Sequence, residues 1–140
     1  FNGQIYASEI ARGLDIFKLK PSEFLSQNEI TAATLAHADT VNPQEQMRIS
    51  WPATAVVGRA YLDQLTRSKA ISAARATAVR GVLDRADSMT NRTSRVGETV
   101  QQLESLAGEL QTDESRLSGA DKTRTHALAE LLKTRASALK

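Results

Sequence analysis

Beyond residue 50 the hydrophobic residues recur every three or four positions, which is the spacing of one face of an α-helix. The pattern predicts four helices, over roughly 52–67, 73–88 and 93–111 and a last one that ends near Leu139. The positions expected to face the core are Val56, Val57, Ala60, Tyr61, Leu65, Val79, Val82, Leu83, Ala86, Val96, Val100, Leu103, Ala107, Leu110, Leu128, Leu131, Leu132 and Leu139. The link 68–71 is short, so the first two helices form an antiparallel hairpin. We expect an up-and-down helical bundle.

Capping signals support these helices and add a smaller one. Pro52 is suited to a first helical position, and Ser72 and Ser118 are candidate caps. The sequence from Ser26 to Glu29 matches a capping box, which predicts a helix over roughly 27–38 with Ile30, Ala33 and either Thr34 or Leu35 on its apolar face. Residues 39–50 are polar and loop-like.

The first part of the chain has the period of β-structure. Gln4–Ala7 and Leu14–Leu19 are typical of short strands, with Gly13 as a turn or bulge. Two strands alone are marginal in water, so they need a sheet to join or a helix to cover them. The expected fold is mainly α: a helical bundle over residues 26–140, preceded by a β segment over residues 1–25.

Composition narrows the functional classes. The chain has 140 residues, a net charge of +2 and no cysteine, which excludes disulfides, thiolate metal sites and cysteine nucleophiles. Basic and acidic residues are interspersed, which argues against a nucleic-acid binder. No apolar stretch is long enough to span a membrane, and no signal peptide is visible. The missing initiator Met suggests a fragment or a processed product.

Candidate catalytic and metal-binding residues are few. His37 and His126 have no ligand partner at metal-site spacing, and the stretch Asp39 to Asn42 lacks the other oxygen ligands of a calcium loop. Asp84 and Asp87 share a helix face, but Arg80 and Arg85 nearby favour a solvated ion-pair surface over acid–base chemistry. We expect no enzyme activity, cofactor or metal.

Two further features have alternative interpretations. An arginine-rich surface in the second half could bind an anionic polymer, although acids are mixed with it; its members are Arg75, Arg80, Arg85, Arg92, Arg95 and Arg116. Asn91 begins a formal glycosylation sequon that is more plausibly part of a helix cap. Trp51 and Tyr61 could line a ligand pocket, although core anchoring is the commoner role.

Several phrases resemble one bacterial family. Gly13 to Ile16, Pro21 to Ile30, Trp51 to Ala53 and Ala60 to Leu65 resemble the C-terminal region of LVIVD-repeat proteins. Those are exported or surface proteins with a β-propeller followed by a helical tail. The resemblance covers roughly residues 6–87 and fades in the last two helices, and the chain contains no LVIVD words.

The resemblance implies a role for the whole chain. Residues 5–19 look like the last strands of a final propeller blade. The resemblance also implies that the protein is exported to the periplasm or the cell surface. The expected function is a non-enzymatic structural or interaction module that packs against an upstream propeller or a neighbouring subunit, with self-association possible. Phe24, Trp51 and Tyr61 are the residues expected at the junction. A small-ligand-binding or enzymatic helical domain, and an anionic-polymer binder, remain the alternatives.

Overall fold

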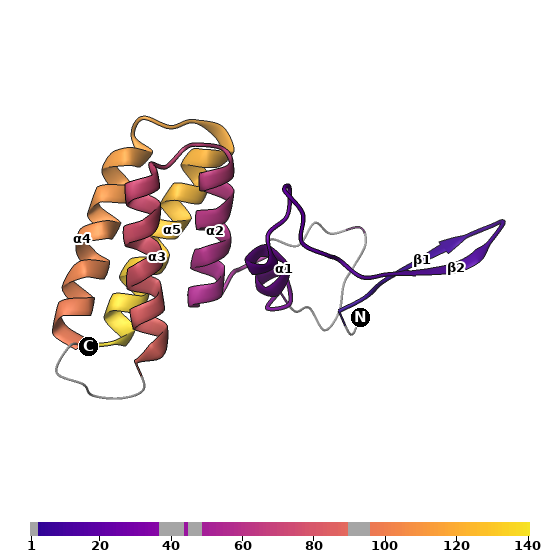
Figure 1. Cartoon of the computed structure of the whole chain (residues 1–140), viewed down its shortest axis with the longest axis horizontal. Coiled ribbons are helices and arrows are strands. Elements are labelled where there is room, and N and C mark those ends of the chain that lie inside the picture. The colour runs from indigo at the N-terminus through magenta and orange to yellow at the C-terminus, as the bar shows by residue number, and fades with distance from the viewer. Residues whose placement is uncertain (1–2, 37–43, 45–48, 90–95) are drawn as a thin grey trace.

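The computed structural model describes residues 3–36, 44, 49–89 and 96–140. Its elements, in chain order, are β1 (Ile5–Glu9), β2 (Gly13–Phe17), α1 (Gln27–Ala33), α2 (Ala55–Arg67), α3 (Ala73–Ser88), α4 (Val96–Glu114) and α5 (Gly119–Ala138). The chain is mainly helical, with a short antiparallel two-stranded sheet ahead of the helices (Figure 1). The predicted fold class is confirmed.

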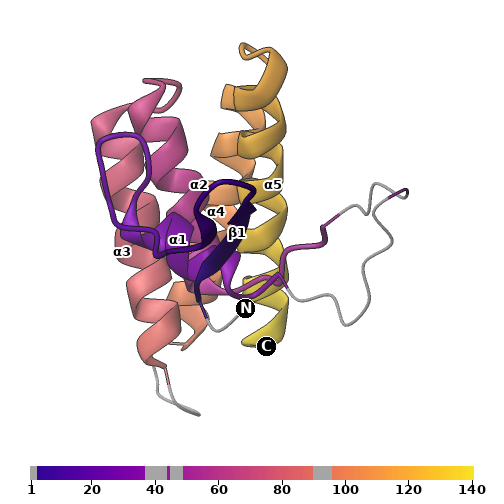
Figure 2. The ribbon, with the colours of Figure 1, turned by 90° about the vertical axis from the view of Figure 1, so that its right-hand side faces the viewer.

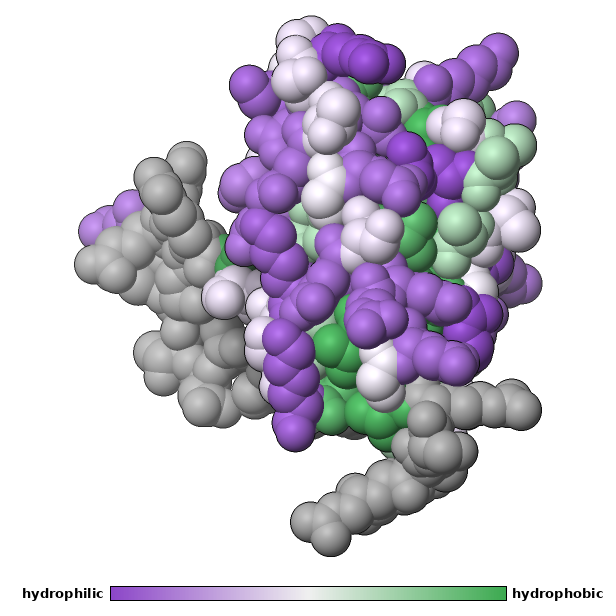
Figure 3. All heavy atoms as spheres, turned by 90° about the vertical axis from the view of Figure 1, so that its left-hand side faces the viewer, coloured by the Kyte–Doolittle hydropathy of each residue, from purple (hydrophilic) through white to green (hydrophobic). Residues whose placement is uncertain are grey.

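The four long helices form a closed ring. α2 contacts α3 and α5, and α4 contacts the same two helices from the other side, so the ring encloses one hydrophobic core (Figure 1). Its largest fully buried side chains are Leu62, Leu65, Val79, Val82, Leu83, Leu103, Leu110, Leu128 and Leu132. The face of the bundle that carries α4 is mostly hydrophilic, with small hydrophobic areas between polar side chains (Figure 3).

α2 begins later than predicted. Its first residue is Ala55 and its N-cap is Thr54, so Trp51 and Pro52 precede the helix. The backbone N–H of Thr54 donates to the carbonyl of Pro52 in a tight turn. Proline fixes one backbone dihedral wherever it stands, and here it shapes the turn before the helix.

α2 ends in a turn that reverses the chain into α3. Lys69 adopts a left-handed conformation with φ of 61°. Its N–H donates to the carbonyl of Thr66, and the N–H of Ala70 donates to the carbonyl of Leu65. This is the Schellman arrangement that satisfies the last carbonyls of a helix. Ser72 then caps α3 by accepting from the N–H of Arg75, as the sequence predicted.

α2 also approaches its neighbours closely at Gly58. A Cβ at this position would lie 2.9 Å from Leu83 Cδ1 of α3 and 3.3 Å from Leu131 Cδ2 of α5. Any larger residue would require these leucine side chains to shift. The absent side chain therefore lets three helices meet at one level of the core.

α1 is shorter than predicted, and its buried face differs. The helix ends at Ala33, and Ala32 is its buried residue, whereas Ala33, Thr34 and Leu35 are exposed. The predicted apolar face was therefore wrong at Ala33, Thr34 and Leu35, whereas Ile30 is partly buried. The helix has seven residues and packs on α2 (Figure 2). Ala32 joins the hydrophobic core, and polar side chains complete the contact.

The β segment forms a hairpin that projects away from the bundle (Figure 1). Ile5 pairs with Phe17 and Glu9 with Gly13, in an antiparallel register. Gly13 has φ of 92°, a left-handed conformation that closes the turn into β2. The strands contact each other, and neither of them packs extensively on a described helix.

Candidate functional site

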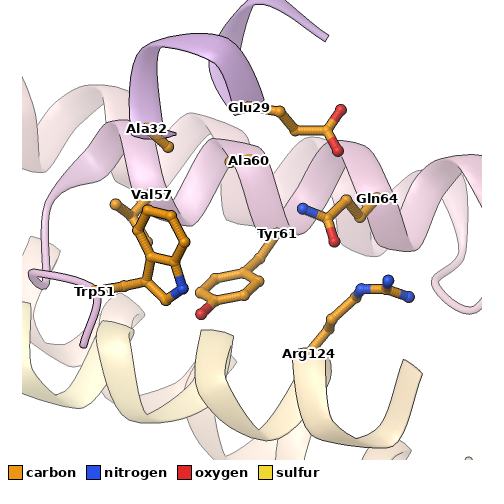
Figure 4. Close-up of a pocket in the computed structure, with 8 residues that line it drawn as sticks. All are labelled: Glu29, Ala32, Trp51, Val57, Ala60, Tyr61, Gln64 and Arg124. Carbon is orange, nitrogen blue, oxygen red and sulfur yellow. The ribbon is translucent and has the colours of Figure 1, made fainter. Parts of the chain in front are cut away.

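One hollow of the helical part lies between α1, α2 and α5. It has a volume of about 250 Å³. Trp51, from the segment before α2, and Tyr61 of α2 lie side by side at one end of it (Figure 4). Val57, Ala60 and Ala32 complete an apolar lining. The two predicted junction aromatics are thus brought together.

Polar groups gather at the other end of this hollow. They are Glu29 of α1, Gln64 of α2 and Arg124 of α5 (Figure 4). Arg124 Nη1 donates to Asp121 Oδ1 at 3.1 Å, one helical turn earlier. Burial raises the pKa of the Tyr61 phenol, so this hydroxyl stays neutral at physiological pH. The hollow is therefore apolar at its aromatic end and polar at its rim.

A second hollow of about 360 Å³ adjoins the first and shares Trp51, Val57 and Tyr61 with it. The remainder of its lining comes from α5 and from residues 49–53. Trp51 is 38% exposed. This is a large exposed fraction for tryptophan, which is highly buried on average. The two aromatics therefore form the wall between two open hollows.

α1 is held on α2 by an unusually polar contact. Glu29 Oε1 accepts from Arg67 Nη2 at 2.7 Å, and Glu29 Oε2 accepts from Arg67 Nη1 at 3.0 Å and from the Ser26 backbone N–H at 2.7 Å. Ser26 in turn accepts from the N–H of Glu29, so the predicted capping box is confirmed. Burial alone would raise the pKa of Glu29, but the hydrogen bonds from Arg67 and Ser26 hold it below its ordinary value.

A second carboxylate extends this contact to α3. Asp63 accepts from Asn28 Nδ2 at 2.7 Å and from Arg80 Nη2 at 2.9 Å. Burial opposes ionisation of Asp63, but its hydrogen bonds lower the pKa of the carboxyl overall. Two charge-assisted networks therefore fix the orientation of α1 on the bundle.

Phe24 does not join the other two aromatics. Ser22 and Leu25 form an isolated antiparallel bridge, with the N–H of Ser22 donating to the carbonyl of Leu25 at 2.9 Å. Phe24 lies in the turn between them and is 76% exposed. Its side chain is available for contact with another molecule, and its role at a junction stays a prediction.

Asp84 and Asp87 lie in an ion-pair surface, but the arginine that pairs with them is Arg59. Arg59 of α2 donates to Asp84 Oδ1 at 2.7 Å and to Asp87 Oδ2 at 3.3 Å. Arg80 and Arg85, the expected neighbours, bond instead to Asp63 and to Gln102. Antiparallel packing of α2 on α3 puts Arg59 within reach of both carboxylates.

Much of the arginine-rich surface is engaged with partners. Arg75 pairs with Glu109 and Asp113 of α4, and Arg80 and Arg85 are bonded as described. Arg92 and Arg95 lie outside the described residues. These pairings reduce the positive charge that the surface could offer to an anionic polymer.

His126 is exposed and lies 3.1 Å from Glu114 through Nδ1. No group of three or more His, Asp or Glu side chains that could hold a metal ion occurs among the residues that the structure describes. His37, the stretch from Asp39 to Asn42, and Asn91 lie outside the described residues. No described helix is both long and apolar enough to cross a membrane.

Comparison with known proteins gives no relative. No family model, curated protein or solved structure matches the chain. The resemblance to LVIVD-repeat proteins therefore stays a prediction from sequence phrases.

The polar residues of the hollow between α1, α2 and α5 were not predicted from the sequence. Gln64 and Arg124 are sixty positions apart and have ordinary surface character. Gln64 does lie three residues after Tyr61, on the same side of α2, and that spacing was a usable signal. For Arg124 the chain offers no local signal, because only the packing of α5 on α2 brings it there.

Proposed function

We propose that the chain is a non-enzymatic interaction module: the helical C-terminal domain of an exported β-propeller protein, whose hairpin joins β-structure outside the described residues. The partner sheet belongs to an upstream propeller or to a neighbouring subunit. The observation that carries the proposal is the hairpin itself, which exposes large apolar side chains and leaves its outer edges unpaired by any described strand.

The two faces of the hairpin differ. Tyr6 and Ile16 are cross-strand partners, and Leu14 lies two residues before Ile16 on the same strand. The three side chains therefore share one face of the hairpin. Leu14 is 62% exposed and Ile16 is 55% exposed. We call these three residues the apolar face. An isolated hairpin is marginally stable in water, so burial of this face against a partner is what would make it persist.

The opposite face is apolar only near its base. Ile5 and Phe17 form a cross-strand pair there. Towards the turn this face carries Glu9 and Asp15, both of which accept from Arg12. Charges at an exposed strand discourage indiscriminate pairing. The proposed partner therefore covers the apolar face and adds a strand at an open edge, as in β-strand addition.

The first experiment is the intact denatured mass of the polypeptide from its native source, followed by hydrogen exchange. A mass far above 15.2 kDa is expected, together with slow exchange of the β1 and β2 amides. In the isolated chain the same amides should exchange quickly. A native mass of 15.2 kDa, with a monomeric protein and equally fast hairpin exchange, would contradict the proposal.

A substitution series tests which face is covered. Leu14→Thr with Ile16→Thr removes apolar surface and places β-branched threonine at both positions, so strand propensity is preserved. The matched control is Ala7→Thr on the opposite face. The double variant should lose hairpin protection in the intact native protein, whereas the control should keep it. If the isolated chain dimerises and only the double variant is monomeric, the covering sheet is a second copy.

A further inference from the structure

The geometry points to a small-molecule site in the hollow between α1, α2 and α5, selective for a compact apolar molecule that carries a carboxylate. This inference goes beyond the interaction role proposed above and depends on different residues. The hollow combines a mostly apolar lining with a few convergent polar groups, which is the usual composition of a ligand site.

The apolar end provides a surface for a flat molecule. Trp51 and Tyr61 lie adjacent there (Figure 4). Aromatic rings bind other rings in offset or edge-to-face geometry. At about 250 Å³ the hollow is smaller than most ligand sites, which measure about 300–1,000 Å³, so it suits a molecule about one ring in size.

The polar end determines the charge of the ligand. Glu29 already accepts from Arg67 and from the Ser26 backbone, so its carboxylate is neutralised and has little capacity for an added cation. Arg124 uses one N–H on Asp121, and a guanidinium has five N–H donors. Among the described residues, the side-chain amide of Gln64 has no hydrogen-bond partner.

The unused capacity at the rim is therefore mostly hydrogen-bond donors. A carboxylate placed there would accept from the Arg124 guanidinium and from the Gln64 amide. Charge-assisted hydrogen bonds of this kind are roughly twice as strong as neutral ones. The Asp121–Arg124 pair is partly exposed, and such pairs contribute little, so sharing the guanidinium with a ligand costs little.

Trp51 is the chain's one tryptophan, so its fluorescence reports on this hollow directly. We expect phenylacetate to change that emission saturably, with a dissociation constant of roughly 0.1–1 mM for so small a ligand. Phenylacetamide, which has the same ring and no charge, should bind at least about tenfold more weakly because it cannot form the charge-assisted bonds.

Variants assign the binding to the rim. Arg124→Gln should weaken phenylacetate binding at least about tenfold, whereas Arg85→Gln, on the contact of α3 with α4, should leave it unchanged. The comparison of acid with amide uses the unmodified protein, so it holds even if a variant fails to fold. The inference is overturned if no saturable change occurs, if the amide binds as well as the acid, or if Arg124→Gln binds as well as Arg85→Gln.

Discussion

Gly58 allows a quantitative test of how tightly the bundle is packed. We consider Gly58→Ala in α2 and, as its matched control, Gly108→Ala in α4. Both glycines are helical. A Cβ at Gly108 would have no atom within 4 Å, whereas at Gly58 it would meet Leu83 Cδ1 at 2.9 Å and Leu131 Cδ2 at 3.3 Å.

Both substitutions gain helix propensity, but only Gly58→Ala also introduces overpacking. Replacing a helical glycine by alanine stabilises the helix by about 1 kcal/mol. At Gly58 this gain is opposed by overpacking, because Leu83 is fully buried and Leu131 nearly so. Overpacking a core costs about 1–3 kcal/mol. Gly108→Ala should therefore be stabilised by about 1 kcal/mol, and Gly58→Ala should lie about 1–3 kcal/mol below it.

The measurement is the free energy of unfolding in urea, monitored by helical circular dichroism. Thermal midpoints should differ in the same direction by about 4 °C per kcal/mol. An equal gain in stability for both variants would refute the reasoning, because it would mean that Leu83 and Leu131 move aside at no cost. A change in the urea slope for one variant alone would point to the unfolded state instead.

Three further outcomes follow from named contacts. Lys69→Gly should raise the free energy of unfolding by about 0.5–1 kcal/mol, because glycine adopts the left-handed conformation without the Cβ clash; a lower thermal midpoint would contradict this. Leu103→Ala should lower it by about 2–5 kcal/mol, measured in urea, since the side chain is fully buried; a loss below 1 kcal/mol would contradict a close-packed core. The pKa values of Glu29 and Asp63 are lower in the folded protein than their ordinary values of 4.5 and 3.8. Both carboxylates therefore stabilise the docked α1 at a pH above those ordinary values, and this stabilisation should be lost as the pH falls through the lower pKa values of the folded state. Hydrogen exchange of α1 against pH checks this, and protection that rises on acidification would refute it.

The long helices could be predicted from the sequence because each carries an apolar stripe. In α4 the predicted residues Val100, Leu103, Ala107 and Leu110 are buried, and Val96 at the start of the helix is partly buried. A stripe that repeats over five turns leaves one choice of buried face, and packing follows from it. Helix starts were less certain, and α2 begins three residues after the predicted position because a proline suits a turn as well as a first helical residue.

The candidate site was only partly predictable. Trp51 and Tyr61 were selected as bulky residues in a chain with few aromatics, and the hollow contains both. The polar contacts that dock α1 were not predicted. They depend on Glu29 pairing with Arg67 of α2 and on Asp63 pairing with Arg80 of α3, and these partners are distant in sequence. Such pairs carry no periodic signal, and only the three-dimensional arrangement shows which cation each carboxylate meets.

The carboxylate of Glu29 makes the folding of α1 depend on the bundle. A seven-residue helix is too short to persist alone in water. The same side chain that closes its capping box also receives Arg67, so helix formation and docking are one event. The helix α1 therefore persists only while its docking surface on α2 is formed. The hairpin precedes α1 in the chain and makes its extensive contacts within itself, so undocking of α1 would release the helix and the hairpin from the bundle together.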